Sequence, residues 1–63
     1  MTIRVFVLDD HVMVRTGMCL LLGAQPGLDV VGQAETGEDA LPMLRRLRPD
    51  VLLCDVHLPG ISG

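Results

Sequence analysis

The sequence predicts an α/β fold in which three strands and two helices alternate in the order βαβαβ. Three short segments are predicted to be strands: the apolar segments Ile3–Leu8 and Val51–Cys54, and the strand candidate Leu28–Ala34. The two segments between them place apolar residues at helical spacing. Helical connections of this length favour parallel strands joined by right-handed crossovers, in a sheet that is covered on both faces.

The first helix is expected over residues 11–22. Four residues at helical spacing would form its core-facing side: Val14, Met18, Leu21 and Leu22. The opposite side, which includes Arg15 and Thr16, can face water. Gly23 and the turn-forming residues after it are expected to stop the helix.

The second helix is expected to start at Thr36, which can cap it in a variant of the capping box with Asp39. Arg48 would end it. Its apolar side would be formed by four residues: Ala40, Leu41, Leu44 and Leu47. Pro42 is the awkward residue, because a proline in a helix interior removes a hydrogen bond and clashes with the preceding turn. Either the helix begins nearer residues 38–39, which puts Pro42 in the first turn, or the helix is kinked.

The composition argues against several classes of protein. The 63 residues make at most one small domain, and a hydrophobic fraction of 49% is too high for a disordered segment. A net charge of −3, with no basic cluster beyond Arg45, Arg46 and Arg48, argues against direct nucleic-acid contact by these residues. No apolar run approaches the ~18 residues of a membrane span and no leader opens the chain, so we expect a cytoplasmic protein without membrane contact.

The two cysteines, Cys19 and Cys54, lie in segments predicted as helix and strand. Their spacing matches neither a CxxC motif nor a metal-binding pattern. We therefore expect both to be buried and reduced.

Acidic residues follow two of the three predicted strands. Asp9 and Asp10 come directly after the first strand, and Asp55 comes directly after the third. The carboxyl ends of parallel strands share one edge of the sheet, so these carboxylates meet if the first and third strands are neighbours. A divalent cation would relieve their repulsion, and carboxylates with a backbone carbonyl and waters suit Mg²⁺ better than zinc.

Each acid also has a simpler interpretation. An Asp-Asp pair after a strand is most often a helix N-cap and turn, and an aspartate before Leu-Pro-Gly is ordinary in a loop. Two histidines, His11 and His57, flank the acids. We expect His11 to start the first helix, and the main-chain carbonyl of His57 is a better candidate ligand than its ring. The placement of acids at matching ends of two strands is what favours a metal site.

Three stretches resemble the receiver domains of bacterial two-component response regulators, of the LuxR/NarL type. They are VFVLDDHVMVRTGMCLLL, VVGQAETGEDAL and PDVLLCDVHLPGISG, which together cover essentially the whole chain. The resemblance implies a flavodoxin-like, doubly wound parallel sheet with strand order 2-1-3-4-5. Residues 1–63 would be the N-terminal part of such a receiver, without its last two strands and three helices and without a DNA-binding domain.

The resemblance also implies roles for single residues. Asp55 would be the phosphorylation site, a nucleophile that takes a phosphoryl group from a histidine kinase, in a protein that is not itself an enzyme. Mg²⁺ would be bound by Asp10 directly and by Asp9 directly or through water. Asp55 and the main-chain carbonyl of His57 would complete its protein ligands. The output would be control of transcription through the missing DNA-binding domain.

Other interpretations stay open. Without the lysine and hydroxyl residue of a complete receiver, the chain could be a receiver-like interaction or dimerisation module that never takes phosphate. An aspartate-nucleophile phosphatase is disfavoured because His57 stands where an acid is needed, and a nucleotide-binding half-domain because no Gly-rich turn follows the first strand. An isolated chain that stops at Gly63 would leave Val51–Cys54 with an unpaired apolar edge, and would be unstable or dimerise through that edge.

Overall fold

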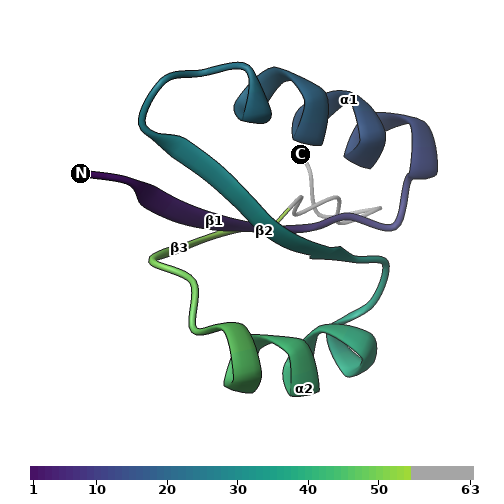
Figure 1. Cartoon of the computed structure of the whole chain (residues 1–63). Helices are drawn as coiled ribbons and strands as arrows, with labels where there is room; N and C mark the ends of the chain where they lie inside the picture. Colours follow the sequence, from purple (N-terminus) through teal and green to yellow (C-terminus); the bar gives the residue numbers. More distant parts are fainter. Residues whose placement is uncertain (55–63) are drawn as a thin grey trace, which may run out of the picture.

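The predicted alternation of strands and helices is confirmed by the computed structural model, which describes residues 1–54. The three strands form one parallel sheet in the order β2-β1-β3. Helix α1 covers one face of this sheet and helix α2 the other (Figure 1). The elements are β1 (Ile3–Leu8), α1 (Val12–Gly23), β2 (Leu28–Ala34), α2 (Gly37–Leu47) and β3 (Val51–Cys54).

The position of β1 in the middle of the sheet explains where the core lies. The chain crosses from β1 to β2 through α1 and returns over β1 to β3 through α2. Right-handed connections that run in opposite directions across a sheet place their helices on opposite faces. β1 is therefore covered on both faces, and its residues Val5, Phe6 and Val7 are at most 3% exposed.

Phe6 is the centre of the core on the α2 side of the sheet and is fully buried. Its neighbours in this cluster are Leu8, Ala34, Ala40, Met43, Leu44 and Leu47. A register shift between Val5 and Phe6 pairs Phe6 with Gly32 of β2. A β-carbon on Gly32 would lie 2.8 Å from a carbon of the Phe6 ring. The ring can occupy this space because residue 32 has no side chain.

Helix α2 confirms the predicted cap and shows where Pro42 lies in the helix. Oγ1 of Thr36 accepts a hydrogen bond of 3.1 Å from the amide of Asp39, so the helix begins at Gly37. The alternative in which the helix begins nearer residues 38–39 is wrong, and Pro42 lies in the helix interior. The cap, the acids of the first turn and the arginines of the last turn all stabilise α2 against this proline.

Helix α1 has no buried residue, which differs from the prediction. The predicted core residues Val14 and Leu21 are 48% and 70% exposed, whereas Met18 and Leu22 are half-buried. The helix ends at Gly23, with Ala24 as its C-cap, so the predicted stop at this glycine and the turn-forming residues after it is confirmed. Neither described helix has the length and apolarity needed to cross a membrane.

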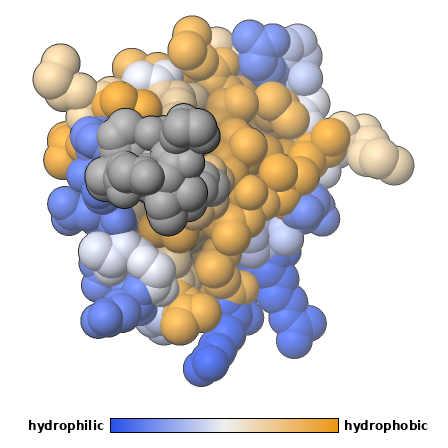
Figure 2. Space-filling model, turned by 180° about the vertical axis from the view of Figure 1, so that it is seen from behind, coloured by the Kyte–Doolittle hydropathy of each residue, from blue (hydrophilic) through white to orange (hydrophobic). Residues whose placement is uncertain are grey.

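Among the described residues, β3 pairs with β1 on one side only. Its residues Val51 and Leu52 are 41% and 46% exposed. Figure 2 views the molecule from behind Figure 1, where β3 lies, and shows a broad apolar surface. Within residues 1–54, the third strand therefore has the unpaired apolar edge that was expected. Leu41 of α2, predicted to face the core, is also exposed, and Met43 packs against the core instead.

Arg48 ends α2 in a left-handed backbone conformation, with φ of 49°. This conformation costs a residue with a β-carbon roughly 1 kcal/mol, a cost that glycine escapes. The substitution Arg48→Gly relieves this strain, but glycine loses more chain entropy on folding. The net result is therefore expected to be a free energy of unfolding that is higher by about 0.5 kcal/mol. Arg46→Gly, inside the helix, is expected to lower it by about 1 kcal/mol. Urea unfolding followed by circular dichroism measures both, and an equal loss in the two variants would contradict the expectation.

Candidate metal site at the carboxyl end of β1

The carboxyl ends of β1 and β3 lie side by side. The two strands are paired in parallel up to Leu8 and Cys54. Asp9 and Asp55 are the residues that follow this last pair in the sequence. The neighbouring position of the first and third strands, on which the predicted meeting of the acids depends, is confirmed. Asp55 and His57 themselves lie outside the described residues.

Asp9 is the buried acid of the site, with a residue exposure of 2%. Its main-chain amide donates to the carbonyl of Ala34 at 3.1 Å, which extends the contact between β1 and β2 beyond the end of the strand. Its Oδ1 accepts a hydrogen bond of 2.8 Å from the main-chain amide of His11. The simpler interpretation of the acid pair is therefore confirmed for the turn, at the end of the sheet, but wrong for the N-cap, which is His11.

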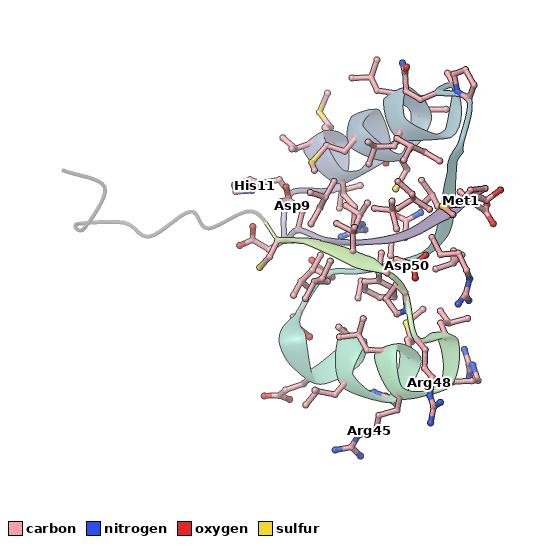
Figure 3. The ribbon with its side chains drawn as sticks, turned by 90° about the vertical axis from the view of Figure 1, so that its left-hand side faces the viewer. Met1, Asp9, His11, Arg45, Arg48 and Asp50 are labelled. Atoms are coloured by element: carbon pink, nitrogen blue, oxygen red, sulfur yellow. The ribbon has the colours of Figure 1, made fainter. Side chains whose placement is uncertain are left out.

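Asp10 and His11 complete a cluster with Asp9. The side chain of Asp10 is 70% exposed, and its Oδ1 lies 2.9 Å from Nδ1 of His11. The same Nδ1 lies 3.2 Å from Oδ1 of Asp9. One potential ligand atom from each of the three residues lies within 4.8 Å of the others. Figure 3 shows Asp9 and His11 together at one end of the sheet. Carboxylate oxygens at this spacing have the chemistry to hold a hard cation.

His11 also begins helix α1, as predicted. It is the N-cap residue, although its side chain makes no capping hydrogen bond. Its ring is 48% exposed and lies beside both acids. No ligand role was predicted for this ring, and the one signal in the sequence for its position is that His11 directly follows the two acids.

Two residues that the sequence analysis did not place in the site, Arg15 and Gln33, brace it. Nη1 of Arg15 donates to the main-chain carbonyl of Asp9 at 2.8 Å, and Nε donates to Oε1 of Gln33 at 3.0 Å. Arg15, on the side of α1 that was predicted to be able to face water, is a half-buried residue that lies one turn after His11, and its guanidinium reaches the ends of two strands. Thr16 is exposed, as predicted.

A second polar cluster lies at the opposite end of the sheet. Oδ2 of Asp50 accepts a hydrogen bond from the amide of Arg4 at 2.8 Å, and the amide of Asp50 donates to the carbonyl of Arg4 at 2.8 Å. Nη1 of Arg4 also donates to the carbonyl of Arg48 at 3.0 Å. Arg48 and Asp50 lie at the other end of the sheet from Asp9 in Figure 3. These bonds help to fix the register of β3 against β1. The register in turn sets Leu8 and Cys54 as the last paired residues of the two strands.

The two cysteines are free, and their burial differs from the prediction. Cys19 of α1 is half-buried and Cys54 of β3 is exposed. The prediction of a buried thiol is wrong for Cys54, because β3 is an edge strand among the described residues.

A family model described as the response regulator receiver domain matches residues 5–63. The chain belongs to this family. Similar curated proteins are the response regulator GacA of Pseudomonas aeruginosa, 56% identical over 61 residues, and the DNA-binding transcriptional activator DevR/DosR of Mycobacterium tuberculosis, 48% identical over 61 residues. The nitrate/nitrite response regulator NarL of Escherichia coli is 39% identical over 59 residues. The predicted resemblance to LuxR/NarL-type receivers is confirmed.

The receiver chain matches only part of each of these relatives. The alignments with GacA and DevR/DosR each cover 97% of this chain and 28% of the relative, and the alignment with NarL covers 94% and 27%. A solved structure, the signal receiver domain of the response regulator NarL from Mycobacterium tuberculosis, superposes with a TM-score of 0.82 at 39% identity. This match covers 98% of the receiver chain and 50% of the other chain. The flavodoxin-like receiver fold is confirmed for the part that the chain spans.

Proposed function

We propose that Asp55 of this receiver chain accepts a phosphoryl group from a phosphohistidine on a histidine kinase. The observation that carries the proposal is the parallel register of β1 and β3, whose last paired residues immediately precede Asp9 and Asp55. The chain would act in the cytoplasm as the N-terminal part of a receiver. It would control transcription through a DNA-binding domain outside these residues, without touching nucleic acid itself. One relative is named a DNA-binding transcriptional activator, which supports this output.

The cofactor of the proposed reaction is Mg²⁺. Its proposed ligands are Asp9, Asp10, Asp55 and the main-chain carbonyl of His57. The carboxylates of Asp9 and Asp10 fit this ion, because each offers a hard oxygen and these oxygens lie within 4.8 Å of each other. Bound Mg²⁺ neutralises negative charge on the oxygens of the transferring group.

The proposed reaction needs one nucleophile from the receiver chain. A carboxylate oxygen of Asp55 forms the new bond to phosphorus while the bond from phosphorus to the kinase imidazole breaks. The imidazole keeps the electron pair and takes up a proton, and Asp55 becomes an acyl phosphate. The chain is a reactant that changes state and not a catalyst that turns over, so we propose a phosphoryl acceptor and not an enzyme.

The test is transfer of labelled phosphate from a phosphorylated histidine kinase in the presence of Mg²⁺. The chain is expected to take up label that hydroxylamine removes, as it removes acyl phosphates. Asp55→Asn is expected to abolish the label, whereas Asp29→Asn, an exposed acid on β2, should leave it unchanged. Label that persists in Asp55→Asn would refute the assignment, and absence of label from every variant would favour a receiver-like module that never takes phosphate.

The exposed edge of β3 supports a further partner, a second copy of the chain. β3 carries no charge and no proline, the two features by which edge strands commonly avoid pairing. Two β3 edges can pair about a two-fold axis, which buries Val51 and Leu52 of both copies. We expect a concentration-dependent dimer in sedimentation velocity. Leu52→Lys should give a monomer, whereas Leu41→Lys, at a similarly exposed leucine on α2, should still dimerise. A parent chain that is monomeric at all concentrations would refute this contact.

A further inference from the structure

The segment from Asp9 to His11, which carries both described acids, is held by hydrogen bonds on either side of Asp10. Before Asp10, the main-chain carbonyl of Asp9 accepts a hydrogen bond of 2.8 Å from Nη1 of Arg15. After Asp10, the carbonyl of His11 accepts a hydrogen bond of 2.8 Å from the main-chain amide of Arg15. Arg15 therefore holds the segment twice, with its guanidinium on one side of Asp10 and its backbone on the other.

Arg15 is itself held in place by β2. Its Nε donates to Oε1 of Gln33 at 3.0 Å, and Gln33 is paired with Val7 in the sheet. A guanidinium presents several N–H donors in a rigid plane, so it can serve a main-chain carbonyl and a side-chain amide at once. The side chain thus connects the first turn of α1 to the carboxyl ends of both β1 and β2.

We propose that Arg15 is a positioning residue for the magnesium site, an inference that rests on the proposed function. The side chain of Asp10 is 70% exposed, so the backbone of residues 9–11, more than packing, sets the direction of its carboxylate. If the Asp9 carbonyl is released, the peptide between Asp9 and Asp10 can rotate, and the two carboxylates lose their common orientation. Arg15 would act through this peptide and not by contact with the ion.

Positioning and simple charge make opposite predictions for Arg15. A positive guanidinium near the acids repels a cation, so a role through charge alone means that removing Arg15 strengthens Mg²⁺ binding. A positioning role means that removing it weakens Mg²⁺ binding, because the acids are no longer pre-arranged. The sign of the change therefore separates the two roles.

The test is a calorimetric titration of the full chain with Mg²⁺, with urea unfolding of each variant measured in parallel. Arg15→Met is expected to bind Mg²⁺ about tenfold more weakly, the scale typical of residues that orient metal ligands. Arg15→Lys should not restore binding, because an ammonium group keeps the charge but not the planar arrangement of donors. Gln33→Leu should also weaken binding, and the double variant should resemble Arg15→Met, since both residues act through one contact.

Arg4→Met is the matched control. Nη1 of Arg4 also donates to a main-chain carbonyl, that of Arg48, but at the opposite end of the sheet. This variant is expected to bind Mg²⁺ as the parent does. If Arg15→Met fails to fold, Arg15→Lys and Gln33→Leu carry the test. A parent chain that does not bind Mg²⁺ would refute the proposed function. A parent that binds, with Arg15 variants that bind equally well or more tightly, would refute this inference alone.

Discussion

Replacing Gly32 by valine is expected to lower the free energy of unfolding by about 3 kcal/mol, through overpacking of the core. A β-carbon at this position would lie 2.8 and 3.0 Å from two carbons of the Phe6 ring and 3.0 Å from Cδ1 of Leu47. Phe6 is fully buried, so the ring has no free space into which it can move. Strand propensity alone predicts the opposite sign, because valine is favoured in strands and glycine is not.

Gly17 of α1 provides the control for this substitution. A β-carbon there meets no atom within 4 Å. Gly17→Ala is therefore expected to raise the free energy of unfolding by up to about 1 kcal/mol, the difference in helix propensity. Urea unfolding followed by circular dichroism compares the two variants with the parent. A Gly32→Val chain as stable as the parent would contradict the packing of Phe6 against Gly32.

Replacing Asp9 by asparagine is expected to weaken Mg²⁺ binding at least about 100-fold. This is a larger loss than the one expected for Arg15→Met, because Arg15 only orients the ligands. The side-chain oxygen of the asparagine can still accept the hydrogen bond from the main-chain amide of His11, so the turn into α1 is preserved. Without Mg²⁺ the variant should be at least as stable as the parent, because a neutral amide replaces a carboxylate that is buried close to Asp10.

Thermal unfolding with and without Mg²⁺ measures this difference. At a concentration of 100 times its dissociation constant, Mg²⁺ should stabilise the parent by about 2.7 kcal/mol and should stabilise Asp9→Asn hardly at all. Asp29→Asn, an exposed acid on β2, should respond to Mg²⁺ as the parent does. Equal stabilisation of Asp9→Asn and the parent would show that the ion binds elsewhere.

Local features of the sequence were enough to predict the elements of the fold. All three strands have the predicted bounds, because each is a short segment with β-branched residues that is followed by acidic residues. The start of α2 was predictable from Thr36, whose side chain needs only an amide three residues along the chain. The shared edge of the sheet at which β1 and β3 end was predictable, since the carboxyl ends of parallel strands lie at one edge.

Prediction was less successful for the exposure of apolar side chains. Helical spacing gave the apolar side of α1 but not the extent of its burial, and Val14 and Leu21 are largely exposed. The reason is that burial depends on what packs against a helix, and α1 packs only against β1 and β2 among the described residues. The same reason makes β3 an edge strand with an exposed Cys54.

Local sequence was enough to predict the order of the elements, the bounds of the strands and the presence of acids after β1 and β3, since these follow from residues close together in the chain. The packing of Phe6 against Gly32 and the reach of Arg15 to Asp9 and Gln33 depend instead on how whole elements are arranged in space. The first contact depends on a register shift between two strands, and the second on where a helix lies over the sheet. Both join residues from different elements, whose distances local propensity and periodicity do not specify.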